Sequence, residues 1–295
     1  MVYDDRFRAY LRDVRKMAPN SVTAYVRDLN EFEAYMAERG VSDLKDTAES
    51  DTAAWLMDLK SGNRSAATIG RKLASVRAFF KYLNSQGLMS TNPSVDIKTP
   101  KVARKEVEYL TIDEVEGLLV KPDTSLKGVR DKAILELLYA TGMRVTELIE
   151  MNISDVNLRM GFVTLRGVHG KARIIPLGRP ARAALEEYIY EDRAKLLRDK
   201  RDNEEALFLN YYGERITRQA LWKIMKGYAA EAKIEKKITP QTLRNSFAVH
   251  MIQNGADLKT LQELLGHEDI SATQIYLSVT KNKIKDVYDR THPRA

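Results

Sequence analysis

The chain has 295 residues, 44% hydrophobic and 30% charged, so it can bury one or two cores and does not have the composition of a disordered protein. Lysine and arginine number 48 against 41 acidic residues, and the formal charge of +7 suits a polyanionic partner. The absence of cysteine excludes disulfide scaffolds, thiolate metal sites and cysteine nucleophiles, and it fits the reducing cytoplasm. No apolar run approaches the ~20 residues of a membrane span, so no membrane association is expected.

The clearest interruption of the chain is the stretch 92–106. Pro93 and Pro100 disfavour helix there, and the basic residues between and after them show no amphipathic period. We therefore predict an N-terminal domain over residues 1–92, a linker over 93–106 and a C-terminal domain over 107–295.

The N-terminal part predicts a small bundle of helices. Ser21 can cap a helix whose apolar residues recur every three or four positions until Gly40. A second clear helix runs from Ser65 to Gly87, and weaker helices are expected near 5–15 and 51–60.

A basic face is predicted on the helix that follows Ser65. Arg71, Arg77 and Lys81 project away from its apolar stripe within an arc of about 120°, if each residue turns the helix by ~100°. On one helix alone such a face is most simply solvated. On a basic protein the same face can bind phosphates, so these three residues are candidate DNA contacts.

The C-terminal part predicts more helix and one small sheet. Thr111 and Glu114 form a capping-box pattern, and the apolar segment 133–140 predicts a buried central helix. Segments rich in β-formers flank the loop 167–171 and predict an antiparallel hairpin. Further helices are expected at 180–197, at 217–232 and from Pro240 onward.

Several chemistries lack their usual residues. The sequence has no glycine-rich phosphate loop and no serine-hydrolase elbow, and no carboxylate cluster suggests a two-metal nuclease. The four histidines, His169, His250, His267 and His292, show no metal-ligand spacing. We expect a chemistry that uses neither a metal nor a cofactor.

Two arginines stand at unusual positions. Arg144 directly follows the predicted buried helix and a glycine turn, where a permanent cation needs an anion, and Glu147 is its simplest partner. Pro240 can open a helix that places Gln241 and Arg244 three residues apart on one face. A helix N-terminus, an amide and a guanidinium together suit a phosphate.

A histidine and a tyrosine follow these arginines in the chain. An amphipathic helix ends at Gly266 and presents His267 just beyond its end, and Tyr276 lies nine residues later. Taken singly, His267 can be an ordinary helix-end histidine and Tyr276 a packed aromatic residue. The order of arginine, arginine, histidine and tyrosine makes a shared site the stronger interpretation.

These motifs resemble those of the tyrosine recombinases of the phage integrase family, and within it the Xer type. The resemblance covers nearly the whole chain and rests on four ordered stretches: ATGMRVTEL at 140–148, TPQTLRNSFA at 239–248, LLGH at 264–267 and TQIY at 273–276. It implies a mainly α fold, with an N-terminal helical bundle, the SAM-like core-binding domain, and a mixed α/β catalytic domain with a small antiparallel sheet.

The resemblance implies that Tyr276 attacks a DNA phosphodiester to give a 3′-phosphotyrosyl link and a free 5′-hydroxyl. Arg144 and Arg244 would then clamp the non-bridging oxygens, and His267 would donate a further hydrogen bond. Because the link keeps the ester, the strand can be rejoined without ATP, and no cofactor is expected.

Two positions depart from the family pattern. Gln241 stands where the family usually has histidine, and an amide cannot shuttle a proton. The family's hairpin lysine, which protonates the leaving 5′-hydroxyl, falls on Val168 when the chain is aligned without gaps. Lys171, three residues further on, is our candidate for that acid, and His169 is a second substitute.

The leading hypothesis is a site-specific DNA recombinase that acts in chromosome dimer resolution, with roles in chromosome partition and cell division, or in integration of a mobile element. Its implied partners are double-stranded DNA with a recombination site and the other subunits of a homo- or hetero-tetramer on that DNA. A second Xer-type recombinase and a DNA translocase are further candidate partners. A type IB topoisomerase is one alternative. A DNA-binding relative with impaired catalysis is the other.

Overall fold

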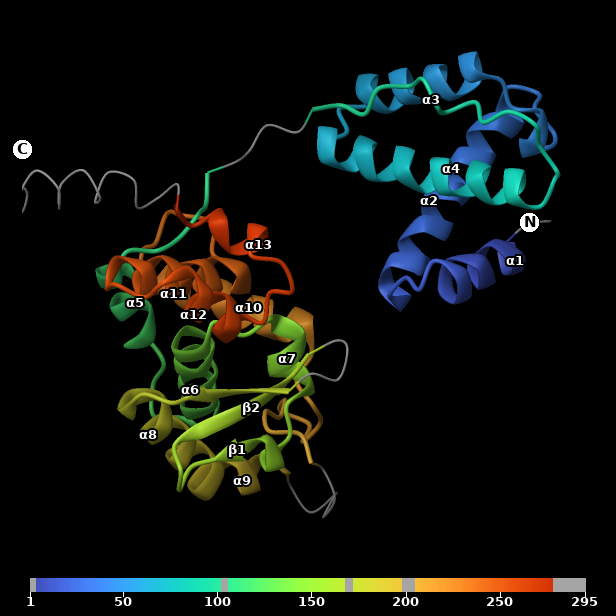
Figure 1. The fold of residues 1–295 in the computed structure, drawn as a ribbon. Helices are drawn as coiled ribbons and strands as arrows, with labels where there is room; N and C mark the ends of the chain where they lie inside the picture. The colour runs from blue at the N-terminus through green and yellow to red at the C-terminus, as the bar shows by residue number, and fades with distance from the viewer. Residues whose placement is uncertain (1–3, 102–105, 168–171, 198–204, 278–295) are drawn as a thin grey trace, which may run out of the picture. The chain divides into compact units, whose positions relative to one another are not determined.

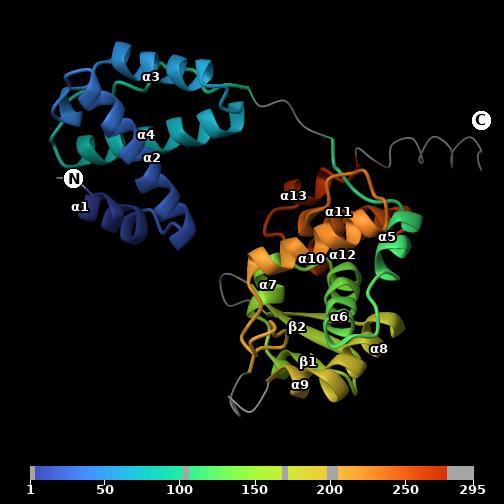
Figure 2. The same cartoon turned by 180° about the vertical axis from the view of Figure 1, so that it is seen from behind.

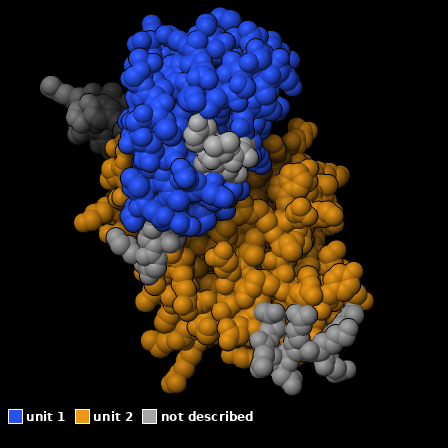
Figure 3. Space-filling model, turned by 90° about the vertical axis from the view of Figure 1, so that its right-hand side faces the viewer, with its two compact units in different colours: residues 1–105 blue, residues 106–295 orange. Residues whose placement is uncertain are grey.

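The structure is a computed structural model that describes residues 4–101, 106–167, 172–197 and 205–277. By its internal contacts the chain divides into two compact units, Met1–Lys105 and Glu106–Ala295, which Figure 3 colours separately. Helices make up most of both units, and the only sheet among the described residues belongs to the second (Figure 1). The predicted mainly α fold with a small antiparallel sheet is confirmed.

The first unit is a bundle of helices, as predicted. Its elements are α1 (Asp4–Ala9), which continues as a π turn (Tyr10–Val14), α2 (Pro19–Glu38), a 3₁₀ turn (Leu44–Asp46), α3 (Glu49–Ser61) and α4 (Ala66–Ser85). Helix α2 packs along α4, and α3 contacts both (Figure 1). Aromatic rings fill the centre, where Phe32 meets Trp55 and Phe80 edge to face at centroid distances of 4.8 and 6.0 Å.

Two N-cap residues are predicted in this unit, Ser21 for α2 and Ser65 for α4. The prediction at Ser65 is confirmed, since its hydroxyl accepts a hydrogen bond from the backbone N–H of Thr68 at 3.2 Å. The prediction at Ser21 is wrong, because α2 already begins at Pro19 after an extended Ala18. Proline has the helical φ built in and needs no N–H in the first turn, so the helix starts three residues earlier than a cap at Ser21 would allow.

The second unit contains the remaining helices and the sheet. Its elements are α5 (Ile112–Leu119), α6 (Leu126–Thr141), α7 (Val145–Glu150), a 3₁₀ turn (Ile153–Asp155), β1 (Val156–Asn157), β2 (Phe162–Arg166), β3 (Ala172–Pro176), α8 (Arg179–Glu187), a π turn (Tyr188–Asp192), α9 (Arg193–Leu197), α10 (Arg218–Glu231), α11 (Pro240–Gln253), α12 (Leu258–Leu265) and α13 (Ser271–Gln274).

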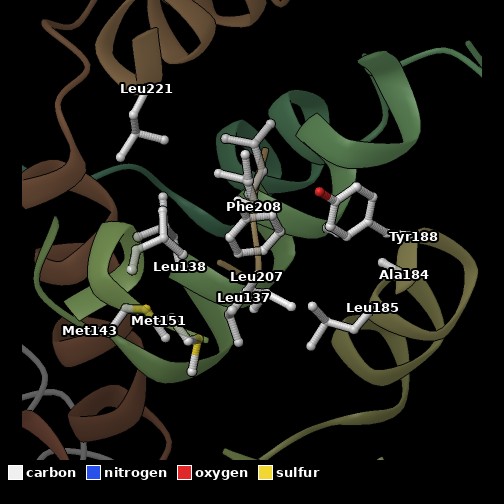
Figure 4. Packing of buried hydrophobic residues seen from close by; sticks show 14 of the residues in the cluster. Leu137, Leu138, Met143, Met151, Ala184, Leu185, Tyr188, Leu207, Phe208 and Leu221 are labelled. Carbon is white, nitrogen blue, oxygen red and sulfur yellow. The ribbon is translucent and has the colours of Figure 1, made fainter. Parts of the chain in front are cut away.

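Helix α6 is the centre of the second unit, as its apolar sequence predicts. It packs against α5, α8, α9 and α11, and Figure 2 shows helices on both sides of it. Leu137 and Leu138 lie in one buried cluster with Tyr188, Phe208 and residues of the other elements (Figure 4). Because α6 is covered on all sides, its C-terminal end is held in a fixed position.

The sheet is small and antiparallel. Strands β2 and β3 pair from Phe162–Pro176 to Arg166–Ala172, which confirms the predicted hairpin. The short strand β1, which was not predicted, adds to the other edge of β2. Along β3 the side chains of Arg173 and Ile175 lie on the inner face, so the strand carries an arginine toward the protein interior.

The turn after α6 depends on a glycine. Gly142 ends the helix in the left-handed conformation with φ of 57°, and a Cβ at this position would overlap the ring of Phe247 on α11. The turn therefore brings α6 and α11 into close contact and starts α7 beside them. Arg144 is the residue that immediately precedes α7.

Candidate active site

Three arginines from three elements meet at the C-terminal end of α12. Arg173 donates through Nε to the carbonyl of Leu264 at 2.8 Å, Arg244 through Nη2 to that of Leu265 at 2.7 Å, and Arg144 through Nη2 to that of Gly266 at 2.8 Å. These carbonyls lie at the end of the helix, where no later turn supplies donors and where the helix dipole is negative. The C-terminal end of α12 thus fixes three guanidinium groups side by side.

Glu147 is the carboxylate of this cluster, as predicted for Arg144. Its side chain is 6% exposed and accepts two hydrogen bonds from Arg173 at 2.7 and 2.8 Å, one from Nη1 of Arg144 at 3.2 Å and one from the backbone N–H of Arg144 at 2.6 Å. Burial alone would raise the pKa of the Glu147 carboxyl, but these hydrogen bonds and charges lower it below its ordinary value. Three guanidiniums face one carboxylate, so the cluster is cationic.

Arg244 is the most buried of the three arginines, with 3% of its surface exposed. Its Nη1 donates to the carbonyl of Gly142 at 2.6 Å, which ties α11 to the turn after α6. Burial, and next the charge of Arg144, lowers the pKa of Arg244 to about 10, so the group still carries its charge at neutral pH. Arg144 is less covered, with 37% of its side chain exposed.

His267 joins the cluster as a neutral ring. Its Nε2 lies 2.9 Å from Nη2 of Arg244 and its Nδ1 lies 2.8 Å from Oγ1 of the buried Thr273. A guanidinium only donates, so Nε2 accepts and the ring proton sits on Nδ1, where it points to Thr273. Burial, and then the charges of Arg244, Arg144 and Arg173, lowers the pKa of His267 to about 4.

Tyr276 is buried close to these residues, with 1% of its surface exposed. Its hydroxyl donates to Oδ1 of Asn245 at 3.1 Å, and the same oxygen accepts from Nε2 of Gln241 at 2.9 Å. Nδ2 of Asn245 donates to the carbonyl of Glu108 at 2.9 Å. Burial raises the pKa of Tyr276 against the lowering effect of Arg244, so the phenol is protonated at neutral pH.

The structure therefore places Arg144, Arg244 and His267 at one helix end, where His267 contacts Arg244 directly and the charge of Arg144 acts on both. Gln241 is exposed and reaches Tyr276 only through Asn245. Val168, which aligns with the family's hairpin lysine, lies outside the described residues, and so do Lys171 and His169, the two candidates for the hairpin acid, and His292.

The three basic residues predicted on α4 lie in the first unit, and their surroundings differ from one another. Arg71 forms an ion pair with the buried Asp28 of α2. Arg77 donates to the backbone carbonyls of Ser94 and Ile97 and to the hydroxyl of Thr99 at 2.8 Å, so it holds the segment after α4 against the helix. Lys81 is exposed.

Two clefts open onto the cluster of the second unit. One, of about 720 Å³, is lined by Arg144, Arg244 and Trp222 of α10, and the other, of about 800 Å³, by Arg144, Arg173 and His267. In the described part of the chain, no group of three or more histidine and acidic side chains could hold a metal ion. Nor does any described helix have the length and apolar composition needed to cross a bilayer.

Sequence reasoning did not identify Arg173 or Asn245. A signal existed for each: Arg173 shares the inner face of a predicted strand with apolar Ile175, where an arginine requires a carboxylate partner. Asn245 lies four residues after Gln241, and amide pairs at this spacing bond on a helix surface.

Comparison with known proteins gives matches over nearly the whole chain. The family model described as "Phage integrase family" matches residues 108–283, and that described as "Phage integrase, N-terminal SAM-like domain" matches residues 5–87. The chain is 48% identical to tyrosine recombinase XerD of Listeria monocytogenes serotype 4b (strain F2365) over 291 residues, which are 98% of each protein. It is also 48% identical to tyrosine recombinase XerD of Oceanobacillus iheyensis, over 98% of this chain and 97% of that protein.

Solved structures share the fold. XerH site-specific recombinase bound to palindromic difH substrate superposes with a TM-score of 0.78 at 22% identity, over 96% of this chain and 83% of that one. The lambda integrase fragment in its dimer on a core site gives a TM-score of 0.72 at 20% identity, over 93% of this chain and 94% of that one.

We predict that His267 in the isolated protein ionises near pH 4 rather than near its ordinary 6.5. Between these two pH values the unfolded chain binds a proton at this residue and the native state does not, so stability falls as the pH is lowered through this window. NMR titration of the imidazole Cε1–H signals, with His267→Gln to identify the signal, measures the pKa.

Thermal unfolding across the same pH range checks the consequence, and His267→Gln should lose part of the acid-side decrease. The variant is necessary because burial also lowers the pKa of His250, which contributes in the same direction. A His267 midpoint at or above 6.5 would contradict the arrangement described above.

Proposed function

The chain belongs to the phage integrase family and is a site-specific tyrosine recombinase, and we propose that it cleaves DNA with Tyr276 as its nucleophile and with Arg144, Arg244 and His267 as its phosphate-binding groups. The observation that carries this assignment is the meeting of the three cationic or hydrogen-bonding side chains at the end of α12, beside the segment that bears Tyr276. A phosphoryl-transfer transition state concentrates negative charge on the non-bridging oxygens, and fixed guanidiniums stabilise that charge.

In the proposed reaction the Tyr276 hydroxyl oxygen attacks the scissile phosphorus and the bond from phosphorus to O5′ breaks. The phenol loses its proton, the leaving O5′ gains one, and the product is a 3′-phosphotyrosyl diester with a free 5′-hydroxyl. Attack of a 5′-hydroxyl on this diester reverses the step and joins the strand, so no nucleotide is consumed.

Arg144 and Arg244 can bind the phosphate while they keep their hydrogen bonds to the carbonyls of α12. Each guanidinium has five N–H groups, of which Arg144 uses two and Arg244 three in the bonds described above. An arriving phosphate diester also raises the pKa of His267 by its charge, which favours the ring form that donates from Nε2. His267 would thus change from an acceptor of Arg244 into a donor to the phosphate.

For the leaving group we propose Lys171 as the general acid, with His169 as the substitute. Both belong to the loop between β2 and β3, and Arg173 ties the second of these strands to the end of α12. Gln241 lines the cleft with Arg144 and Arg244 and contacts Asn245, so we assign it to binding and orientation rather than to proton transfer.

We assign residues 1–92 to a DNA-binding core-binding domain, 93–106 to a linker and 107–295 to the catalytic domain. Arg71, Arg77 and Lys81 are the proposed phosphate contacts of the first. Similarity to XerD proteins over the full chain supports an Xer-type role in chromosome dimer resolution in the cytoplasm, by a homo- or hetero-tetramer on paired DNA sites.

We predict that the full chain forms a covalent adduct with a nicked duplex and that Tyr276→Phe forms none. The duplex is one that the chain selects from a random-sequence pool. A nick placed just 3′ to the scissile phosphate lets the short fragment that carries the free 5′-hydroxyl diffuse away. Denaturing gel electrophoresis detects the adduct, because a phosphotyrosyl link survives detergent and heat.

The same material separates the alternatives. A recombinase excises the DNA between two directly repeated sites, whereas a topoisomerase relaxes supercoils on a plasmid without paired sites. A DNA-binding relative binds the duplex and forms no adduct on any substrate, which would refute the assignment of Tyr276.

Substitution of Lys171 tests the source of the proton for the leaving group. Lys171→Ala should slow adduct formation about 10²- to 10⁴-fold on ordinary DNA, the usual contribution of a general acid. It should have little effect when sulfur replaces O5′ at the scissile position, since a thiolate leaves without a proton. Equal losses on both substrates would exclude Lys171 as the acid, and His169→Ala tested on the same pair examines the substitute.

Substitutions on α4 test the proposed DNA contacts of the first unit. Arg71→Gln, Arg77→Gln and Lys81→Gln should each reduce the slope of log affinity against log salt concentration by about 1, because each removes one phosphate contact. Lys60→Gln on α3 is the matched control and should leave the slope unchanged. Thermal unfolding is followed in parallel because Arg71 and Arg77 also hold contacts within the unit. An unchanged slope rules out the residue concerned.

A further inference from the structure

We propose that Arg173 is a positioning residue that neutralises Glu147 and so keeps Arg144 available to the DNA phosphate. The inference rests on the proposed function, in which Arg144 binds that phosphate. It assigns to Arg173 a role in the charge distribution of the site rather than a contact with DNA.

The geometry of Glu147 distinguishes its two arginines. Arg173 engages both carboxylate oxygens at 2.7 and 2.8 Å, whereas the side chain of Arg144 makes a single contact of 3.2 Å with one of them. Paired hydrogen bonds between a guanidinium and a carboxylate are the stronger arrangement. Arg173 is therefore the principal partner of the Glu147 carboxylate, and the side chain of Arg144 makes only one weaker contact with it.

The position of Glu147 makes this division necessary. Its backbone contact with Arg144 starts α7, so the carboxylate must lie within reach of the Arg144 guanidinium. A buried carboxylate without a full partner is strongly destabilising. If Arg173 were absent, Glu147 would draw Arg144 into a paired contact of its own and compete with the phosphate for it.

The surroundings of Arg173 fit a fixed guanidinium. Its side chain is 13% exposed, and Nε donates to the carbonyl of Leu264 at 2.8 Å, on the edge of the group that does not face Glu147. A Cβ at position 266 would lie 2.8 Å from Nη1 and 3.1 Å from Cζ of Arg173. Gly266 therefore leaves the room that the guanidinium occupies. A lysine could supply the charge but not the three directed hydrogen bonds.

The experiment is a double-mutant cycle on the full chain, with Arg173→Gln, Glu147→Gln and the double variant. The readout is the single-turnover rate of adduct formation on a saturating nicked duplex. We expect Arg173→Gln to lower the rate about tenfold or more, and we expect Glu147→Gln, added to it, to recover about tenfold, because removing the carboxylate releases Arg144.

A structural role alone would give a different result. Thermal unfolding is measured for each variant, and if the double variant is as slow as Arg173→Gln or slower, the proposal is overturned. If Arg173→Gln does not fold, Arg173→Met, which also removes the charge, replaces it and the same recovery is required. Arg166→Gln removes an arginine of β2 that forms an ion pair with the carboxylate of Asp155; it is the matched control and should keep the normal rate.

Tyr276→Phe in the same series separates the two levels of inference. An adduct that persists in this variant would refute the proposed nucleophile. An adduct that is lost in Tyr276→Phe, together with no recovery in the double variant, would refute the role of Arg173 and leave the proposed function standing.

Discussion

The C-terminal end of one short helix organises the proposed active site of this protein. Any α-helix leaves its last carbonyl groups without partners in the helix, and a globular protein must supply them. At α12 the backbone N–H groups of Gly266 and His267 bond the carbonyls of Glu263 and Gln262, and arginines bond the three that follow. Like charges gather there because the helix dipole and one carboxylate oppose their repulsion. The guanidiniums are thereby oriented before any ligand arrives, which is the condition for electrostatic catalysis.

Much of this arrangement follows from local sequence, and the rest depends on contacts between distant segments. The apolar run of α6, the hairpin and the cap at Ser65 are visible in periodicity and residue type, and the structure contains all three. The predicted start of α2 at Ser21 is wrong because Pro19, whose φ is already helical, begins the helix before the serine can cap it. The contacts of Arg173 and Asn245 could not be foreseen, since their partners lie on other elements that only the folded chain brings near. Motif resemblance indicated which residues share a site, but it did not indicate which atoms they use.

The tyrosine is held in a form that cannot react by itself. Its hydroxyl points to the oxygen of an amide, which accepts a hydrogen bond but cannot take up the proton, and burial favours the neutral phenol. Asn245 also donates a hydrogen bond through its Nδ2, which explains why an amide suits this position. A carboxylate would place an oxygen against the carbonyl of Glu108, where the amide now donates. Reactivity thus requires a change in the surroundings of the phenol, and a bound phosphodiester between the arginines would bring such a change.

The long separation between partners in this site has a consequence for biosynthesis. Arg144 and the carbonyl that it bonds are 122 positions apart, and the amide of Asn245 contacts a residue 137 positions away. Closing such long loops is slow and happens late in folding, after more local structure has formed. A nascent polypeptide would therefore carry the proposed nucleophile without the groups proposed to activate it, and the ability to cut DNA would appear only together with the completed tertiary structure.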